Sequence, residues 1–251
     1  MSTRRTLRRS EEGSPAAALA GGALAYVLAR KWRRSHSPKG ALEAALLRAG
    51  DRYSGAPGHY VRAKIASDPV VREVASIGEL GEVVDMGCGR GQMLVVLLEA
   101  ARATRGVGFD WDAAKIEIAR AAAAGLPATF ESGDLLAHAI ATCDTVLLID
   151  VLHYLTDAEQ DDLLGRAAAA ARRRVVVRDI DPDRGWRSAV ARVEEAISTR
   201  LGINRGARIR VRPVSAITNA LEARGFTVSV APCWGATPFA NVLIVGTKTP
   251  A

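Results

Sequence analysis

The 251-residue sequence is poor in aromatic residues and in cysteine. Phe, Trp and Tyr make up 5% of it, and the three cysteines, Cys88, Cys143 and Cys233, are far apart and form no CxxC pair. This spacing indicates neither a disulfide framework nor a metal site, so a reducing compartment fits best. Long apolar runs are also lacking. The best stretch, Pro15–Ala29, is mostly Ala and Gly, and it is shorter than the roughly 20 residues that a transmembrane helix needs.

The positive charge of the sequence is concentrated at its N-terminus. The chain carries 34 Lys and Arg against 27 Asp and Glu, a net charge of +7. Residues 1–40 contain nine cations and two acidic residues, so this segment alone accounts for the +7 and residues 41–251 are neutral overall. A protein that binds nucleic acid needs a basic face on its folded body. We therefore expect no nucleic-acid partner, and we divide the chain into a basic extension, residues 1–40, and one folded domain, residues 41–251.

Beyond residue 40, short apolar runs alternate with Ala-rich helical patterns. Strands are expected at Glu82–Met86, Gly106–Asp110, Ala128–Glu131, Asp144–Asp150, Arg174–Asp179, Phe226–Ala231 and Asn241–Gly246. Helices are expected at Gly40–Gly50, His59–Ser67 (after a turn at 56–58), Gln92–Ala103, Ala113–Ala123, Asp157–Ala171, Gly185–Leu201 and Ser215–Arg224. This alternation predicts an α/β fold with a mostly parallel sheet and helices on both faces. Only a loop separates the last two strands, so the final strand is expected to be antiparallel or to lie at a different edge.

The strongest local motif is a glycine loop between the first strand and the next helix. It reads Asp85-Met86-Gly87-Cys88-Gly89-Arg90-Gly91, and its glycines let the backbone turn sharply and approach a ligand closely. A nicotinamide site would show GxGxxG with a pyrophosphate over the helix N-terminus. The DxGxGxG spacing differs, and Asp85 suits a ligand that carries an amino group and no pyrophosphate. The motif therefore favours S-adenosylmethionine (SAM), although a tight turn without a ligand is an alternative.

Two further acidic residues end the next two strands. Asp110 lies 19 residues after Gly91, where an acidic residue can accept hydrogen bonds from both ribose hydroxyls. Asp134 follows the third strand, where a carboxylate can accept a hydrogen bond from an adenine amine. Solvated strand ends are the simpler explanation for each residue alone. Their occurrence together at one sheet edge points to an adenosine site.

With these residues, the sequence resembles the class I SAM-dependent methyltransferases over residues 56–251. The glycine loop matches the family's cofactor loop, Asp110 its ribose-binding acid and Asp134 its adenine-contacting acid. The resemblance implies a Rossmann-like sheet of seven strands, with antiparallel strand seven between strands five and six, and SAM as the cofactor. The cofactor-binding residues are expected to be Asp85, Gly87, Cys88, Gly89, Gly91, Asp110, Trp111, Asp134, Leu135 and Asp150.

Three segments resemble more narrowly the methyltransferases of bacterial aryl-polyene and xanthomonadin-type pigment pathways. They are His59–Lys64 with Asp68–Val70, Ile149–Tyr154 and Thr237–Leu243. This resemblance implies an aromatic acceptor, phenolic or acyl-linked. The basic extension and the stretch Arg178-Asp179-Ile180-Asp181 depart from the pattern, which leaves the exact acceptor open.

His153 is the candidate catalytic residue. Methyl transfer is an in-line displacement that needs alignment, and a hydroxyl acceptor also benefits from a general base with a pKa near neutrality. A packed histidine in the pocket wall is the alternative. Tyr154 is a candidate for the acceptor pocket, and His59 and Tyr60 are candidates for a lid. Arg178, Trp186 and Arg187 are candidates for binding the acceptor, with a solvated basic helix as the alternative.

The location of the protein depends on how residues 1–40 are interpreted. A disordered or loosely helical tail and a helix resting on anionic lipid both fit the two basic clusters. Export is disfavoured because SAM is made in the cytosol, although Arg4-Arg5 weakly resembles a twin-arginine signal. We expect a cytoplasmic enzyme, with peripheral contact at the inner face of the membrane as an option.

The expected function is methyl transfer from SAM to a small molecule, as in O-methylation in secondary metabolism. A methyltransferase acting on nucleic acid or protein is one alternative, but residues 41–251 are neutral and no base-methylation motif is visible. A non-catalytic SAM-binding protein is the other alternative. Such a protein would be expected to have lost some of the three acids Asp85, Asp110 and Asp134.

Overall fold

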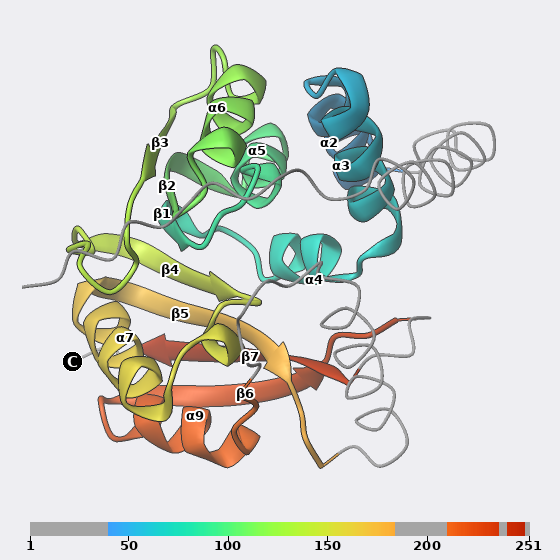
Figure 1. The fold of residues 1–251 in the computed structure, drawn as a ribbon. Helices are drawn as coiled ribbons and strands as arrows, with labels where there is room; N and C mark the ends of the chain where they lie inside the picture. The colour runs from blue at the N-terminus through green and yellow to red at the C-terminus, as the bar shows by residue number, and fades with distance from the viewer. Residues whose placement is uncertain (1–39, 184–209, 236–239, 249–251) are drawn as a thin grey trace, which may run out of the picture.

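The computed structural model describes residues 40–183, 210–235 and 240–248 (Figure 1). The basic extension up to residue 39, Trp186, Arg187 and residues 237–239 of the third resembling segment lie outside the described residues, as does the helix expected at 185–201. No helix within the described ranges is long and apolar enough to cross a membrane.

Seven strands form a single sheet. They are β1 (Gly81–Met86), β2 (Ala103–Asp110), β3 (Ala128–Ser132), β4 (Cys143–Ile149), β5 (Ala171–Ile180), β6 (Phe226–Pro232) and β7 (Asn241–Lys248). Their order in the sheet is β3-β2-β1-β4-β5-β7-β6. Strand β7 is antiparallel to both β5 and β6, and the pairings among β1 to β5 are parallel. The structure thus confirms the predicted fold, including the insertion of strand seven between five and six.

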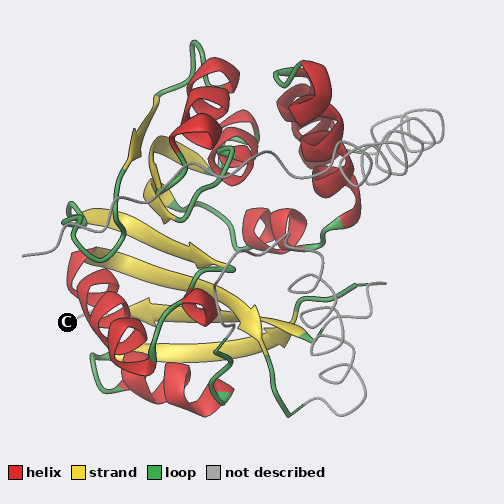
Figure 2. Cartoon of the chain, in the orientation of Figure 1, coloured by secondary structure: helices red, strands yellow, loops and turns green. Residues whose placement is uncertain are grey.

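Helices cover both faces of the sheet (Figure 2). They are α2 (Ala41–Asp51), α3 (Gly55–Ser67), α4 (Val70–Ser76), α5 (Gln92–Glu99), α6 (Ala113–Ala122), α7 (Asp157–Ala170) and α9 (Val214–Glu222), with a short 3-10 helix, η1 (Leu152–Tyr154). One core cluster joins α2 to α6 with alternate residues of the central strands, such as Leu147 and Val176. The other joins α7 and α9 with the opposite residues, such as Val146 and Val177.

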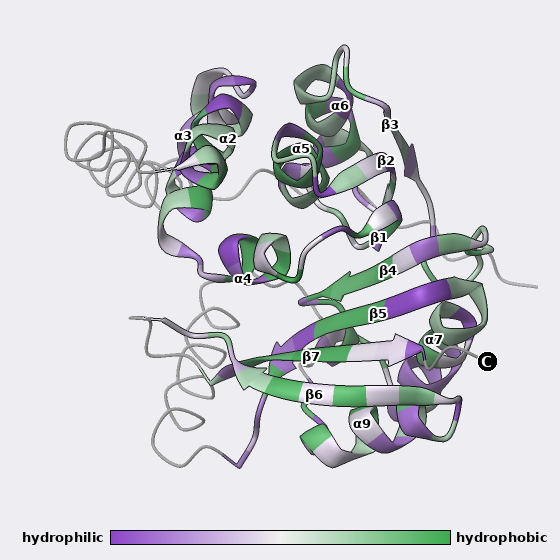
Figure 3. Cartoon of the chain, turned by 180° about the vertical axis from the view of Figure 1, so that it is seen from behind, coloured by the Kyte–Doolittle hydropathy of each residue, from purple (hydrophilic) through white to green (hydrophobic). Residues whose placement is uncertain are grey.

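This double burial explains why the central strands read as continuous apolar runs. Successive side chains of a strand point to opposite faces, so a strand covered on both sides needs apolar residues at every position. Strand β4 shows this pattern, and Leu147 and Leu148 are both fully buried. The hydrophobic stretches in the middle of β4 and β5 are visible in Figure 3.

Several helix boundaries differ from the prediction. Helix α3 begins at Gly55, so residues 56–58 form its first turn and not a preceding turn. Pro57 fits there because the first turn of a helix has no intrahelical partner for its N–H groups. Helix α4 was not predicted, because Asp68-Pro69 was interpreted only as a helix end. Pro69 instead precedes a new helix, and Asp68 Oδ1 accepts a hydrogen bond from the Val70 N–H at 3.1 Å.

Helix α5 ends earlier than predicted and β2 begins earlier. Ala101 adopts a left-handed conformation with φ 52°, and the Arg102 N–H donates to the Leu97 carbonyl at 2.8 Å. This is the hydrogen bond that closes a Schellman-type helix end, which usually uses glycine at the left-handed position. Because alanine occupies it here, the sequence carried no stop signal, and the predicted helix extended to Ala103.

Candidate active site

The three acids of the predicted cofactor site lie side by side at one edge of the sheet. Asp85, Asp110 and Asp134 are at or just after the C-terminal ends of β1, β2 and β3, which are neighbours in the sheet. Asp85 and Asp110 are buried, whereas Asp134 is exposed. The structure therefore brings together the residues that the sequence placed at three consecutive strand ends.

Asp110 ties the glycine loop to the second strand. Its Oδ2 accepts a hydrogen bond from the Gly89 N–H at 2.8 Å, and its Oδ1 accepts one from the Asp112 N–H at 3.0 Å. Its backbone carbonyl accepts the N–H of Gly133, the residue before Asp134, at 3.0 Å. The carboxylate is thus held between the loop of β1 and the turn of β2, with the loop of β3 attached through the backbone.

The three loop glycines all adopt left-handed φ angles, but the space around their missing Cβ atoms differs. A Cβ at Gly87 would overlap Val151, and one at Gly91 would lie 2.7 Å from a ring carbon of Phe130. Packing therefore excludes side chains at these two positions. Gly89, with φ 55°, has nothing within 4 Å of its missing Cβ. The protein itself leaves open space beside Gly89, which is the space that a ligand over the loop would use.

Cys88 contributes its backbone to the loop geometry and its thiol to the core. The N–H groups of Gly87 and Cys88 both donate to the Phe109 carbonyl, at 2.7 and 2.9 Å. The Cys88 side chain is 4% exposed and belongs to the core that contains Phe130. Burial and the charges of Asp85 and Asp110 raise the pKa of the thiol well above its usual range. The thiol is thus kept neutral and unreactive.

Asp85 is the most deeply buried of the three acids. Burial, and then the charge of Asp110, raise its pKa from an ordinary value to about 7. Two neighbouring carboxylates in a desolvated site repel each other, so the ionised pair is favoured when a cation lies close by. A ligand that brings an ammonium group to this edge relieves that repulsion.

Trp111 and Leu135 flank the acids in different environments. Trp111 follows Asp110 directly and is 74% exposed, and the Lys115 ammonium lies 5.4 Å from its ring centroid. Leu135 follows Asp134 and is half-buried against the core of α7 and α9. An exposed indole beside Asp110 is a surface on which a base can stack.

Unpartnered polar atoms support the fit of this site to a polar ligand. Within the described residues, Arg90 Nε in the loop and Gln92 Oε1 at the start of α5 are buried without a hydrogen-bond partner. Buried polar atoms are normally satisfied, so unpartnered atoms in the glycine loop and at the start of the next helix favour a polar ligand there, although Arg102, Gln160 and Arg178 each also have one such atom. The acids, the open loop and these donors and acceptors fit the amino-acid and adenosine parts of SAM.

Helix α3 lies close to the loop through its aromatic residues. The Arg90 guanidinium stacks 4.9 Å from the ring centroid of Tyr60, which is 47% exposed. Tyr53, between α2 and α3, donates from its hydroxyl to the Arg90 carbonyl at 3.0 Å. His59 Nδ1 lies 3.2 Å from an Arg62 nitrogen, on the same helix. Tyr60 therefore lies beside Arg90 of the glycine loop, and its role as a lid stays a prediction.

The candidate base, His153, is held by a partner that the sequence analysis missed. His153 Nδ1 lies 2.7 Å from Asp179 Oδ1, and the two side chains are 7% and 4% exposed. Burial by itself lowers the pKa of His153, but the hydrogen bond and charge of Asp179 outweigh it and raise the pKa. One feature of the sequence could have pointed to Asp179. It stands at the end of the predicted fifth strand, and the fourth strand, which His153 follows, is expected to lie beside it.

The ring of Tyr154 lies beside His153. The two ring centroids are 4.4 Å apart, and Tyr154 is 48% exposed. Burial, followed by the charge of Asp150, raises the pKa of the phenol, so Tyr154 stays neutral. It thus presents an aromatic surface next to the imidazole.

Asp150 and Arg178 form an ion pair in the structure. Asp150 Oδ1 lies 3.2 Å from Arg178 Nε, and Arg178 is 5% exposed. Arg178 Nη1 also donates to both carboxylate oxygens of Asp68 at 2.8 Å. The role of Arg178 in binding the acceptor therefore stays a prediction, and in the structure its guanidinium is paired with two acids of the chain.

Known proteins share both this sequence region and this fold. Residues 83–174 match a family model described as a methyltransferase domain. No curated protein sequence matches the chain. Magnesium protoporphyrin IX methyltransferase from Synechocystis, solved with bound SAH, is 20% identical, with a TM-score of 0.57 over 93% of this chain and 100% of that chain.

Two further solved structures are similar over most of the chain. An O-methyltransferase family protein from Burkholderia thailandensis is 20% identical, with a TM-score of 0.59 over 94% of this chain and 71% of that chain. The pyocyanin biosynthetic protein PhzM is 22% identical, with a TM-score of 0.58 over 96% of this chain and 74% of that chain. At these identities the likeness establishes the fold.

Proposed function

We propose that this chain is a class I SAM-dependent methyltransferase and that it methylates a hydroxyl group of a small aromatic molecule, with His153 as the general base. The methyltransferase-domain match over residues 83–174 and the shared fold support the first part. The observation that carries the proposal is the buried hydrogen bond of 2.7 Å between His153 and Asp179. A buried histidine that only lines a pocket needs a hydrogen-bond partner, but that partner need not carry a charge. A base that must hold one tautomer and become a cation during turnover is favoured by a carboxylate partner.

The pair supports a defined division of roles. Asp179 accepts a hydrogen bond from Nδ1–H, which places the lone pair of the neutral imidazole on Nε2. Nε2 would then accept the proton of an acceptor hydroxyl, which is the role of a general base in methyl transfer. The nearby carboxylate stabilises the imidazolium that results. Asp179 also accepts the Ile180 N–H at 2.8 Å, which fixes the carboxylate itself.

When bound, SAM supplies an electrophilic methyl group on a sulfonium. The residues of the chain orient the two reactants and exclude water. Asp85, Asp110 and the open space at Gly89 hold the cofactor at the ends of β1 and β2. His153 follows the end of β4, which pairs with β1 in the sheet. The base and the cofactor cradle are thus carried by adjacent strands.

The surroundings of His153 favour an aromatic acceptor. Tyr154 and Tyr60 are both large and about half exposed, and Tyr154 stacks near the imidazole. Exposed aromatic side chains at a site edge bind flat ligands through stacking. The resemblance to pigment-pathway methyltransferases also supports an aromatic acceptor, and we extend the proposal to secondary metabolism on that ground.

The test uses the full chain, labelled SAM and a panel of simple phenols and hydroxylated aromatic acids. We expect methyl transfer to at least one phenol, and we expect His153→Ala to lower kcat about 100-fold, the usual contribution of a general base. His138→Ala is the matched control, because His138 is half-buried and pairs with Glu131 away from the dyad. Unchanged turnover in His153→Ala with weaker acceptor binding would show that the residue is a pocket wall.

A further inference from the structure

Arg178 is a buried cation that joins two separate parts of the site. It lies next to Asp179 on β5, and because successive residues of a strand point to opposite faces, the two side chains serve different faces of the sheet. Arg178 Nη1 donates to both oxygens of Asp68, and Nε lies 3.2 Å from Asp150. Asp68 lies between α3 and α4, which we call the cap (residues 55–76). Asp150 lies at the tip of β4.

Asp150 has an unusual backbone conformation. Its φ is 57°, in the left-handed region that residues other than glycine seldom adopt. Its N–H donates to the Arg178 carbonyl at 3.0 Å, so Arg178 contacts it through both backbone and side chain. This conformation turns the chain from β4 into η1, which carries His153 three residues later. We call residues 150–155 the β4 turn.

The pairing of charges is also unusual for a buried site. Arg178 and Asp68 have side chains that are 6% and 13% exposed. Burial lowers the pKa of nearby Lys64, but the charge of Asp150 and then those of Tyr60 and Asp68 raise it above its ordinary value, so Lys64 remains a cation. Buried ion pairs add little to stability, because desolvation offsets their attraction. A cluster of this kind is better suited to fixing relative position.

We propose that Arg178 is a positioning residue that holds the β4 turn, and with it His153, in place relative to the cap. The helix that carries Tyr60 and the turn that carries the base then keep one arrangement across the acceptor site. The catalytic meaning of this coupling rests on the proposed role of His153. The mechanical coupling itself does not, and it is tested independently of any acceptor.

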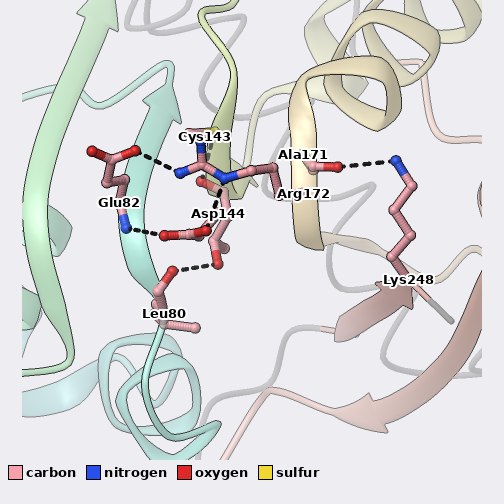
Figure 4. Close-up of polar contacts among 8 residues, drawn as sticks. Leu80, Glu82, Cys143, Asp144, Ala171, Arg172 and Lys248 are labelled. Atoms are coloured by element: carbon pink, nitrogen blue, oxygen red, sulfur yellow. Dashed lines mark hydrogen bonds and ion pairs between the residues drawn. The ribbon is translucent and has the colours of Figure 1, made fainter. Parts of the chain in front are cut away.

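The same strand provides a matched control. Arg172, at the opposite end of β5, also bridges two acids: it contacts Glu82 at 2.6 Å and Asp144 at 3.0 Å (Figure 4). Its side chain is 47% exposed. It lies at the N-terminal end of β5, whereas Arg178 lies near the C-terminal end, beside the cap. Arg172→Lys therefore repeats the chemical change of Arg178→Lys without touching the cap or the β4 turn.

The experiment measures amide hydrogen exchange of the full chain with SAH bound. Asp68→Asn removes one charge on the cap, and Arg178→Lys removes the fork that reaches both acids. We expect both variants to speed exchange in the β4 turn about tenfold, because residues that share one ion-pair network are coupled in energy. Arg172→Lys should leave exchange there at the wild-type rate.

A second readout separates positioning from general weakening of the fold. With a phenol that the enzyme methylates, Asp68→Asn should lower kcat several-fold while the affinity for SAH stays near that of the wild type. The proposal is overturned if Asp68→Asn leaves exchange in the β4 turn unchanged, or if Arg172→Lys raises it equally. If Arg178→Lys does not fold, Asp68→Asn still decides the question, because it retains Arg178. Failure of the base assignment shows separately, as full turnover in His153→Ala.

Discussion

The Oδ2 atom of Asp110 accepts a hydrogen bond of 2.8 Å from the backbone N–H of Gly89, which joins the end of β2 to the open position of the glycine loop. The carboxylate that is expected to bind ribose therefore also shapes the loop that is expected to lie under the amino-acid part of the cofactor. Removing it disturbs both halves of the adenosylmethionine site at once.

We expect Asp110→Ala to weaken SAH binding by at least about tenfold, because charge-assisted hydrogen bonds are lost. Titration calorimetry measures the change. Asp112→Ala is the control, since Asp112 caps α6 through the N–H groups of Ala114 and Lys115. It should cost about 1 kcal/mol of stability and leave the affinity nearly unchanged. Equal affinity in Asp110→Ala and wild type would remove the ribose assignment.

Substitutions at Gly89 and Gly91 should fail in different ways. In Gly91→Ala the new methyl group would lie 2.7 Å from Phe130 and 2.9 Å from Ala119, so we expect a loss of stability of about 1–3 kcal/mol from overpacking. In Gly89→Ala the methyl group enters open space, so only the backbone strain of roughly 1 kcal/mol remains. The affinity for SAH should nevertheless fall more in Gly89→Ala than its stability loss explains.

Urea denaturation and calorimetry on the two variants check this contrast. If Gly89→Ala binds SAH as the wild type does, the space beside Gly89 is not part of the cofactor site. If Gly91→Ala is as stable as the wild type, the packing of Phe130 against the loop is looser than the structure indicates.

The pH dependence of methyl transfer should report the contact between His153 and Asp179. Asp179 raises the pKa of His153, and only the neutral imidazole accepts a proton, so wild-type kcat/KM should rise with pH through that raised pKa. In Asp179→Asn burial and the charge of Arg178 still lower the pKa of His153 and the charge of Asp150 still raises it, but the raising effect of the Asp179 carboxylate is lost. The acidic limb of the profile, the range in which kcat/KM rises with pH, should therefore move to lower pH. The maximal rate should fall, because the tautomer of His153 is no longer fixed.

A pH series of kcat/KM for wild type and Asp179→Asn measures both effects. An acidic limb at the same pH in the two proteins would mean that His153 is not the titrating base. A limb that moves without any fall in the maximal rate would mean that Asp179 acts only through its charge.

The raised pKa of Asp85 predicts an effect on stability in the cofactor-free protein. Its pKa is about 7 in the folded state and near 3.8 when unfolded, so between these values the folded state binds more protons. Its contribution to the free energy of unfolding therefore falls as pH rises from about 4 to about 7, by at most about 1.4 kcal/mol per pH unit.

Asp85→Asn removes this titration. Compared with the wild type in urea denaturation without cofactor, it should gain relative stability between pH 5 and pH 8. A constant difference across that range would show that Asp85 is not held neutral by its burial beside Asp110. The affinity of the wild type for SAH should rise with pH between about pH 5 and pH 8, because the ammonium group of the ligand favours the ionised carboxylate of Asp85.

The order of strands and helices followed from local patterns that survive folding. The predicted strands all exist, and in central strands such as β4 the apolar runs reflect burial on both faces of the sheet. The glycine loop and the acids at the strand ends were also visible, since a left-handed turn selects glycine and a strand end in a parallel sheet faces the ligand edge.

Two predicted element ends were misplaced or unmarked where a residue other than glycine adopts a left-handed conformation. Ala101 ends α5 in the left-handed conformation, and Asp150 turns β4 into η1 in the same region. Neither position carries glycine, so no local signal marked them. Surrounding contacts, such as the hydrogen bond from the Asp150 N–H to the Arg178 carbonyl, stabilise these conformations.

The sequence by itself determined the alternation of strands and helices, the glycine loop and the edge at which the acids gather, because these depend on periodicity and backbone preference within short segments. Only the tertiary structure decided which side chains meet. His153 and Asp179 are 26 residues apart, and Asp68 and Arg178 are 110 apart. Such contacts depend on strand order, on register and on which face each residue occupies, and a shift of one residue in β5 would turn Arg178 and Asp179 to the other faces.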